Sequence, residues 1–141
     1  MHSKMHSKMH SNDAILASNE TIAINMIKAN LAKSNKWVVR AILVIYANQT
    51  ATEQATETTS EHNGVGFNGT DAKILSSFAQ QIIEFEAGRT RFMTPLSRNQ
   101  MVLARRKIAK YSGQLLAAAR AKAAAKEAAA KADGWDVLLT N

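Results

Sequence analysis

The chain of 141 residues contains no cysteine and only one proline. Without cysteine it forms neither a disulfide framework nor a thiolate zinc site, which is compatible with a reducing cytoplasm. One proline and six glycines are too few for the many tight turns of a β-sandwich or barrel. These absences favour a helical fold.

The sequence also lacks a long apolar run and a recognisable catalytic constellation. The longest apolar run, Trp37 to Tyr46, is interrupted by Arg40 and is far too short to span a bilayer. No apolar stretch of a secretory signal follows the polar first residues. The acidic and histidine side chains show no nucleophile–base pair and no two-metal arrangement. We therefore expect a cytoplasmic protein that is not an enzyme, with no membrane segment, cofactor or metal site.

Acidic residues are scarce in the C-terminal part of the chain. Between Arg89 and Lys131 there are eleven Lys or Arg residues and one acid, Glu127, so this segment carries a charge of +10. The rest of the chain carries −3, which accounts for the net charge of +7. Such asymmetry indicates a basic face or arm that acts on a polyanion. The alternative is a solvated lysine-rich helix that binds nothing in particular.

The best-defined helix of the sequence lies between Pro95 and Leu116. Ser97 and Gln100 have the spacing of a capping box, which predicts that the helix begins at this serine. Apolar residues then recur at helical spacing and predict one buried face: Met101, Ala104, Ile108, Tyr111 and Leu115. An Ala- and Lys-rich segment continues the helical pattern beyond Leu116 without large apolar residues. We expect this extension to leave the domain as a basic helical rod.

Basic residues border or oppose the apolar face of this helix. The residues expected to contact phosphates are Arg98, Arg105, Arg106, Lys107 and Lys110, followed along the rod by Arg120, Lys122, Lys126 and Lys131.

Helical spacing of apolar residues also occurs in residues 13–33 and 71–87. The apolar run Trp37 to Tyr46 suits a helix or a buried strand, and we interpret it as a central helix capped by Asn35. The sequence thus predicts an all-α bundle of three to four helices, with a glycine-rich loop and a long basic C-terminal helix. The expected organisation is a disordered tail (1–12), a helical domain (13–116) and an extension with an apolar tag (117–141).

Two segments are candidates for contacting a protein partner. The glycine-rich loop over residues 56–70 allows sharp backbone turns, and the C-terminal tag is apolar. The candidate residues are Gly64, Gly66, Phe67 and Asn68 in the loop, and Trp135 and Leu138 in the tag.

Two stretches carry a resemblance to known proteins. An N-G-x-G-F-N loop precedes a helix with an acidic first residue, and an L-S-x-x-Q helix leads into K-Y-x-x-Q-L. This combination resembles a small module of phage and mobile-element proteins, also found attached to bacterial Snf-type and other helicase-like proteins. The matching positions are Asn63, Gly64, Gly66, Phe67, Asn68, Asp71, Leu96, Ser97, Gln100, Arg105, Lys110, Tyr111, Gln114 and Leu115.

The resemblance covers roughly residues 36 to 116 and implies an accessory role in DNA processing, such as replication or recombination. The chain has no Walker-type phosphate loop, so it cannot hydrolyse ATP by that route. Our first hypothesis is a nucleic-acid-binding accessory protein, with DNA and a helicase or recombination protein as expected partners. The second hypothesis is a protein-interaction adaptor or inhibitor that acts on a host or phage enzyme.

Overall fold

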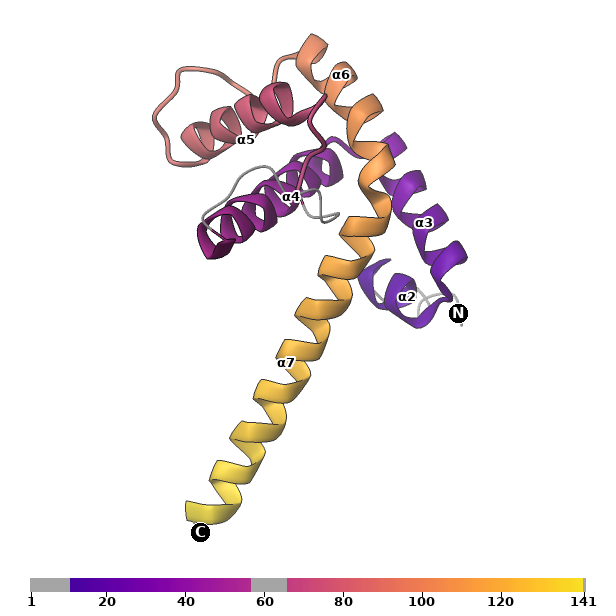
Figure 1. Ribbon diagram of the computed structural model, residues 1–141, viewed down its shortest axis with the longest axis vertical. Helices are drawn as coiled ribbons and strands as arrows, with labels where there is room; N and C mark the ends of the chain where they lie inside the picture. Colours follow the sequence, from indigo (N-terminus) through magenta and orange to yellow (C-terminus); the bar gives the residue numbers. More distant parts are fainter. Residues whose placement is uncertain (1–10, 57–65, 141) are drawn as a thin grey trace, which may run out of the picture.

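The structure, a computed structural model, describes the backbone of residues 11–56 and 66–140 (Figure 1). Side chains are described for residues 13–51 and 66–131. Three predictions therefore lie outside the described residues: the tail up to residue 10, the loop position Gly64, and the side-chain contacts of Trp135 and Leu138.

The described residues form helices joined by turns, with no strand among them, which confirms the all-α class. In chain order the elements are α2 (Ser11–Ala17), α3 (Glu20–Lys33), α4 (Asn35–Thr56), α5 (Ala72–Glu86), α6 (Arg98–Ile108), the 3-10 turn η1 (Ala109–Tyr111) and α7 (Ser112–Thr140).

The helical pattern of residues 13–33 corresponds to two helices, α2 and α3. The break lies at Ser18–Asn19, where the Asn19 side chain accepts a hydrogen bond of 2.9 Å from the backbone N–H of Ile22. This contact caps α3 and satisfies one of its free N–H groups.

The apolar run Trp37 to Tyr46 is helical and forms the first half of α4. Its β-branched residues are compatible with a helix because tertiary packing outweighs their weak helix propensity. Val38, Ile42 and Ile45 are fully buried at 0% exposure. Ser34, and not the expected Asn35, caps this helix, since its hydroxyl accepts a hydrogen bond of 3.2 Å from the Trp37 N–H.

The capping box before α6 is confirmed by both of its hydrogen bonds. The Ser97 hydroxyl accepts from the Gln100 N–H at 3.1 Å, and the Gln100 side chain accepts from the Ser97 N–H at 2.8 Å. The helix does not continue unbroken, however. Turn η1 separates α6 from α7 and shifts the direction in which the following side chains point.

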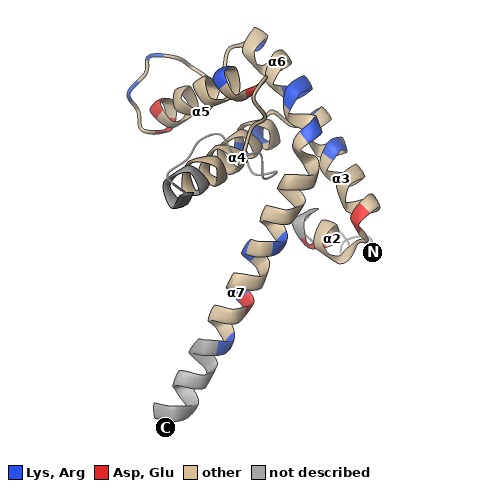
Figure 2. Ribbon diagram, viewed as in Figure 1, with Lys and Arg blue, Asp and Glu red and all other residues tan. Residues whose placement is uncertain are grey.

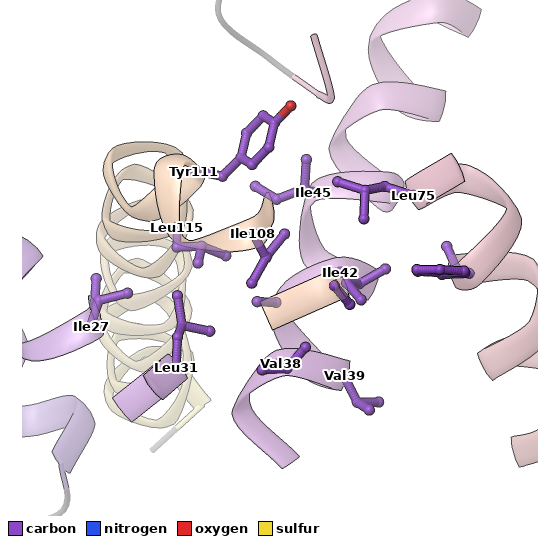
Figure 3. Close-up of a cluster of buried hydrophobic side chains, with 14 of the residues drawn as sticks. Ile27, Leu31, Val38, Val39, Ile42, Ile45, Leu75, Ile108, Tyr111 and Leu115 are labelled. Atoms are coloured by element: carbon purple, nitrogen blue, oxygen red, sulfur yellow. The ribbon is translucent and has the colours of Figure 1, made fainter. Parts of the chain in front are cut away.

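The core lies where α4 meets α5, α6 and α7, with α3 closing one side (Figure 3). The long α7 then leaves the other helices and projects away from them (Figure 1). From Arg120 to Lys131 its side chains are exposed, apart from the half-buried Ala123. Within the described residues, no helix combines the length and apolar character needed to cross a membrane.

Candidate functional site

The glycine-rich loop and α7 are joined by hydrogen bonds between residues far apart in the sequence. The Gln114 amide pairs with both backbone groups of Gly66: it accepts from the N–H at 2.9 Å and donates to the C=O at 2.9 Å. The Gln49 side chain of α4 accepts a further hydrogen bond of 3.0 Å from the Phe67 N–H. We call this contact region, together with Asn68, Asp71, Lys107, Lys110 and Tyr111, the loop clamp.

Gly66 is required by the geometry of the loop clamp. Its φ of +91° lies in the left-handed region that favours glycine. A Cβ at this position would lie 2.7 Å from the Cβ of Gln49, which is closer than side chains tolerate. Only glycine allows the loop backbone to approach α4 this closely.

Tyr111 anchors the loop from the η1 turn. Its ring packs edge-to-face against Phe67, with centroids 5.6 Å apart and an interplanar angle of 84°. Its hydroxyl points towards the segment that precedes α5 (Figure 3). This hydroxyl accepts from the Asn68 N–H at 2.9 Å and donates to the Asp71 carboxylate at 2.8 Å. Burial, together with the donation to Asp71, raises the pKa of Tyr111 to about 12 against the opposing Asn68 contact.

Asp71 is the one fully buried carboxylate among the described residues. Its oxygens lie 3.2 Å from the Lys107 ammonium and 2.7 Å from the Lys110 ammonium. Burial raises the pKa of this carboxyl, but hydrogen bonds from Lys110, Tyr111 and Lys107 outweigh it, so the pKa lies below its ordinary value. Asp71 occupies the N-cap position of α5, but its side chain makes no cap hydrogen bond to that helix, because it is engaged by Lys107, Lys110 and Tyr111.

Those loop residues predicted to contact a partner that the structure describes are engaged inside the molecule. Gly66 and Phe67 are buried, and the backbone N–H of the exposed Asn68 donates to Tyr111. Sequence reasoning missed the contributions of Gln49 and Gln114, although Gln114 belongs to the K-Y-x-x-Q-L stretch. Gly66, Asn68 and Asp71 of the first motif stretch therefore contact residues of the second in one structural cluster, namely Lys110, Tyr111 and Gln114.

Several of the predicted phosphate-contacting residues are also engaged internally. Lys107 and Lys110 pair with Asp71, as described above. Arg105 donates from Nε to the Leu31 carbonyl at 2.9 Å and from Nη2 to Oδ1 of Asn35. Three of the five predicted cations, Arg105 and Lys107 of α6 and Lys110 of η1, therefore make contacts inside the molecule. The phosphate contacts of all five stay a prediction.

The remaining predicted cations are on the surface, over α6 and α7 (Figure 2). Lys131 forms an exposed ion pair of 3.5 Å with Glu127. Exposed residues without an ion pair among the described side chains are Arg98, Arg106, Arg120, Lys122 and Lys126.

A groove of about 960 Å³ lies between the first turns of α4, the segment before α6 and the start of α6. Lys36, Arg40, Arg98 and Arg105 line it together with a single carboxylate, Glu86. We call this the basic groove. Lys36 and Arg40 are both exposed and stand four residues apart, so they share one face of α4. Their spacing is visible in the sequence, but the sequence pattern places Arg40 as an interruption within an apolar segment.

The described residues contain no group of three His, Cys, Asp or Glu side chains placed to hold a metal ion. The Asp71 carboxylate is already shared among two ammonium groups and a hydroxyl.

Comparison of the chain with family models, curated proteins and solved structures finds no match. The resemblance to the phage and mobile-element module thus stays a prediction that rests on the motif residues alone.

Proposed function

We propose that this chain is a non-enzymatic accessory protein of phage or mobile-element DNA metabolism that binds nucleic acid through phosphate contacts. The observation that carries the proposal is the basic groove, which four cations and one carboxylate line. An anion that enters the groove meets an excess of positive charge. Nucleic acid presents negative charge at close, regular spacing and so matches such a surface.

The projecting part of α7 supports the same function. Arg120, Lys122 and Lys126 are exposed there, and Glu127 is the one acid between Arg120 and Lys131. A helix rises about 1.5 Å per residue, so these three cations cover roughly 9 Å along its axis. A phosphate backbone bound at the groove would gain additional contacts if it extended towards this helix.

The proposed contact set differs from the one expected from the sequence. It keeps five of the predicted cations and adds Lys36 and Arg40 from the groove; those kept are Arg98, Arg106, Arg120, Lys122 and Lys126. Because phosphate contacts carry no sequence information, we expect weak sequence preference. Binding driven by counterion release should fall steeply as salt increases.

The proposal is tested by titrating fluorescein-labelled DNA at several salt concentrations and reading its anisotropy. Replacing Arg40 and Arg98 with glutamine should weaken binding and reduce the salt slope by about 2, roughly one per lost phosphate contact. The matched control replaces Lys28 and Lys73, two exposed cations outside the groove, with glutamine. It should change neither the affinity nor the salt slope. Equal effects of the two pairs would contradict the assignment of binding to the groove. An affinity that does not change with salt concentration would contradict the proposed function.

The adaptor hypothesis has one observation in its favour. Val102, which lines the groove, is 60% exposed, and an apolar side chain beside cations also suits an acidic protein surface. A pull-down after nuclease treatment separates the two functions. A partner retained without nucleic acid, and lost on changing Arg40 and Arg98, would favour the adaptor.

A further inference from the structure

The basic groove has an apolar floor between its cations. Its apolar lining residues are Val39, Pro95, Leu96, Met101 and Val102. Most of these residues pack against the core, but Val102 remains 60% exposed. A surface meant only for phosphates gains nothing from the exposed Val102 side chain, which stays in contact with water until a ligand covers it.

The apolar surface continues beyond the groove onto the segment between α5 and α6. A second hollow of about 370 Å³ is lined in part by Phe92 and Met93, and it shares Thr94 and Ser97 with the groove. Phe92 is 61% exposed and Met93 is 92% exposed. The exposed aromatic ring thus stands at the edge of a cationic, apolar-floored surface.

Arg105 gives this surface a fixed positive charge. Its guanidinium lines the groove and is held there by hydrogen bonds to the Leu31 carbonyl and the Asn35 side chain. Lys36, Arg40 and Arg98 are exposed around it and are in no ion pair with another described residue. The groove therefore combines one cation held by hydrogen bonds with three exposed cations.

Nucleic acids differ in what they offer to such a surface. A duplex stacks its bases inside and presents mainly phosphates, so it leaves the apolar floor and Phe92 unused. A single strand presents both phosphates and base faces, which stack on aromatic side chains. A single strand therefore matches this surface in two ways: its phosphates suit the cations, and its bases suit the exposed Phe92 ring and the apolar residues.

We propose that the basic groove binds single-stranded nucleic acid, with a base stacked on Phe92 and phosphates on Lys36, Arg40 and Arg98. This inference rests on the proposed function and specifies its substrate class. The chemistry that the groove recognises, a phosphate backbone with unpaired bases, is shared by DNA and RNA.

The test compares labelled oligothymidylate of about twelve nucleotides with a duplex of equal length, using the full chain. The single strand should bind more tightly. Replacing Phe92 with alanine should weaken single-strand binding about five- to hundredfold and leave duplex binding unchanged. Ile22→Ala, which truncates another exposed apolar side chain outside both hollows, is the matched control and should leave both affinities unchanged.

The outcomes separate this inference from the function on which it rests. If neither DNA binds with salt dependence, the proposed function fails. If both bind equally and Phe92→Ala changes neither, the function stands and the single-strand assignment is overturned. Displacement of the oligothymidylate by polyglutamate at equal charge would show that the groove recognises charge alone and would also overturn it. Labelled oligouridylate identifies the source: Phe92-dependent binding of either strand type supports the proposal.

Discussion

The loop clamp and the basic groove are both rich in cations, yet they use them in opposite ways. In the loop clamp, Lys107 and Lys110 surround a buried carboxylate, and the polar groups find partners inside the molecule. In the groove, four cations face a single exposed acid, Glu86. Cations in this sequence therefore have two roles: Lys107 and Lys110 stabilise the loop by pairing with a buried carboxylate, whereas the exposed groove cations have no such partner. Arg105 has both features, because it lines the groove and also hydrogen-bonds to Leu31 and Asn35.

The comparison predicts that changes in the loop clamp alter stability, and the largest effect is expected at Gly66. Gly66→Ala forces a side chain into the left-handed region and against Gln49, which should lower the free energy of unfolding by roughly 2–4 kcal/mol. Urea denaturation followed by circular dichroism measures this loss. Gly69→Ala is the control, because its Cβ would meet no atom within 4 Å. Equal losses in the two variants would contradict the role assigned to Gly66.

The next effect is expected at Asp71. Asp71→Ala leaves Lys107 and Lys110 without their carboxylate and Tyr111 without its acceptor. The free energy of unfolding should fall by about 2–3 kcal/mol, less than for a fully buried pair because the lysines are partly solvated.

The control for this change is Glu84→Ala, which removes an exposed carboxylate that pairs with Arg89 at 2.8 Å. Solvent screens this surface pair, so its loss should barely move the denaturation midpoint. A larger loss from the Glu84 variant than from the Asp71 variant would refute the contrast between buried and exposed charge.

Tyr111→Phe tests the hydroxyl while keeping the ring contact with Phe67. The variant loses the acceptor for the Asn68 N–H and the donor to Asp71, and we expect a loss of about 1–2 kcal/mol in the free energy of unfolding. Tyr46→Phe is a matched control, since its hydroxyl accepts one exposed hydrogen bond of 3.3 Å from Gln80. If the two variants unfold alike, the Tyr111 hydroxyl does not stabilise the loop.

The loop clamp should also make stability depend on acidity. The folded-state pKa of Asp71 lies below its ordinary value of 3.8, so its contribution to stability is fully present above that pH. The contribution is then lost as pH falls through the folded-state pKa. Unfolding free energies measured between about pH 5 and pH 2 should decline less steeply in Asp71→Asn than in the unaltered chain. Parallel pH curves would argue against a lowered pKa.

The smallest effect on stability is expected in the groove. Lys36→Gln and Arg40→Gln remove exposed charges that pair with no described carboxylate, so unfolding free energies should change by no more than about 0.5 kcal/mol. Differential scanning calorimetry checks this. A substantial loss would mean that the groove, like the loop clamp, serves the fold.

Local signals in the sequence predicted much of the fold. The Ser97–Gln100 capping box needs only residues three apart, and the helical spacing of α5 and α6 depends on neighbouring turns. The roles of Asp71 and Gln114 were not predictable in the same way. Their partners are 36 to 48 residues distant in the chain, and only the packing of η1 and α7 against the loop brings them together.

The positive charge of the candidate site was predictable from the sequence, but the residues that line the site were not. The basic character of α6 and α7 was evident, whereas the engagement of Arg105 depends on the carbonyl of Leu31 at the end of α3. Arg40 lies in a segment that pattern analysis assigns to the core. Its exposure follows from the helical phase of α4, which buries Val39 and Ala41 and leaves Arg40 on the outer face.

The η1 turn rotates the side-chain positions of α7 relative to those of α6. Each 3-10 residue turns the chain by about 120°, against about 100° in an α-helix, so three such residues advance the azimuth by roughly 60°. Arg120 and Lys122 lie about 200° apart around α7, and the offset shifts the directions of both relative to α6. Inserting one residue into α7 before Arg120 would rotate the side chains of Arg120 and Lys122 by about 100° around the helix axis. Inserting seven residues would return them nearly to their original direction. A change in the length of α7 therefore changes the direction in which its later side chains point.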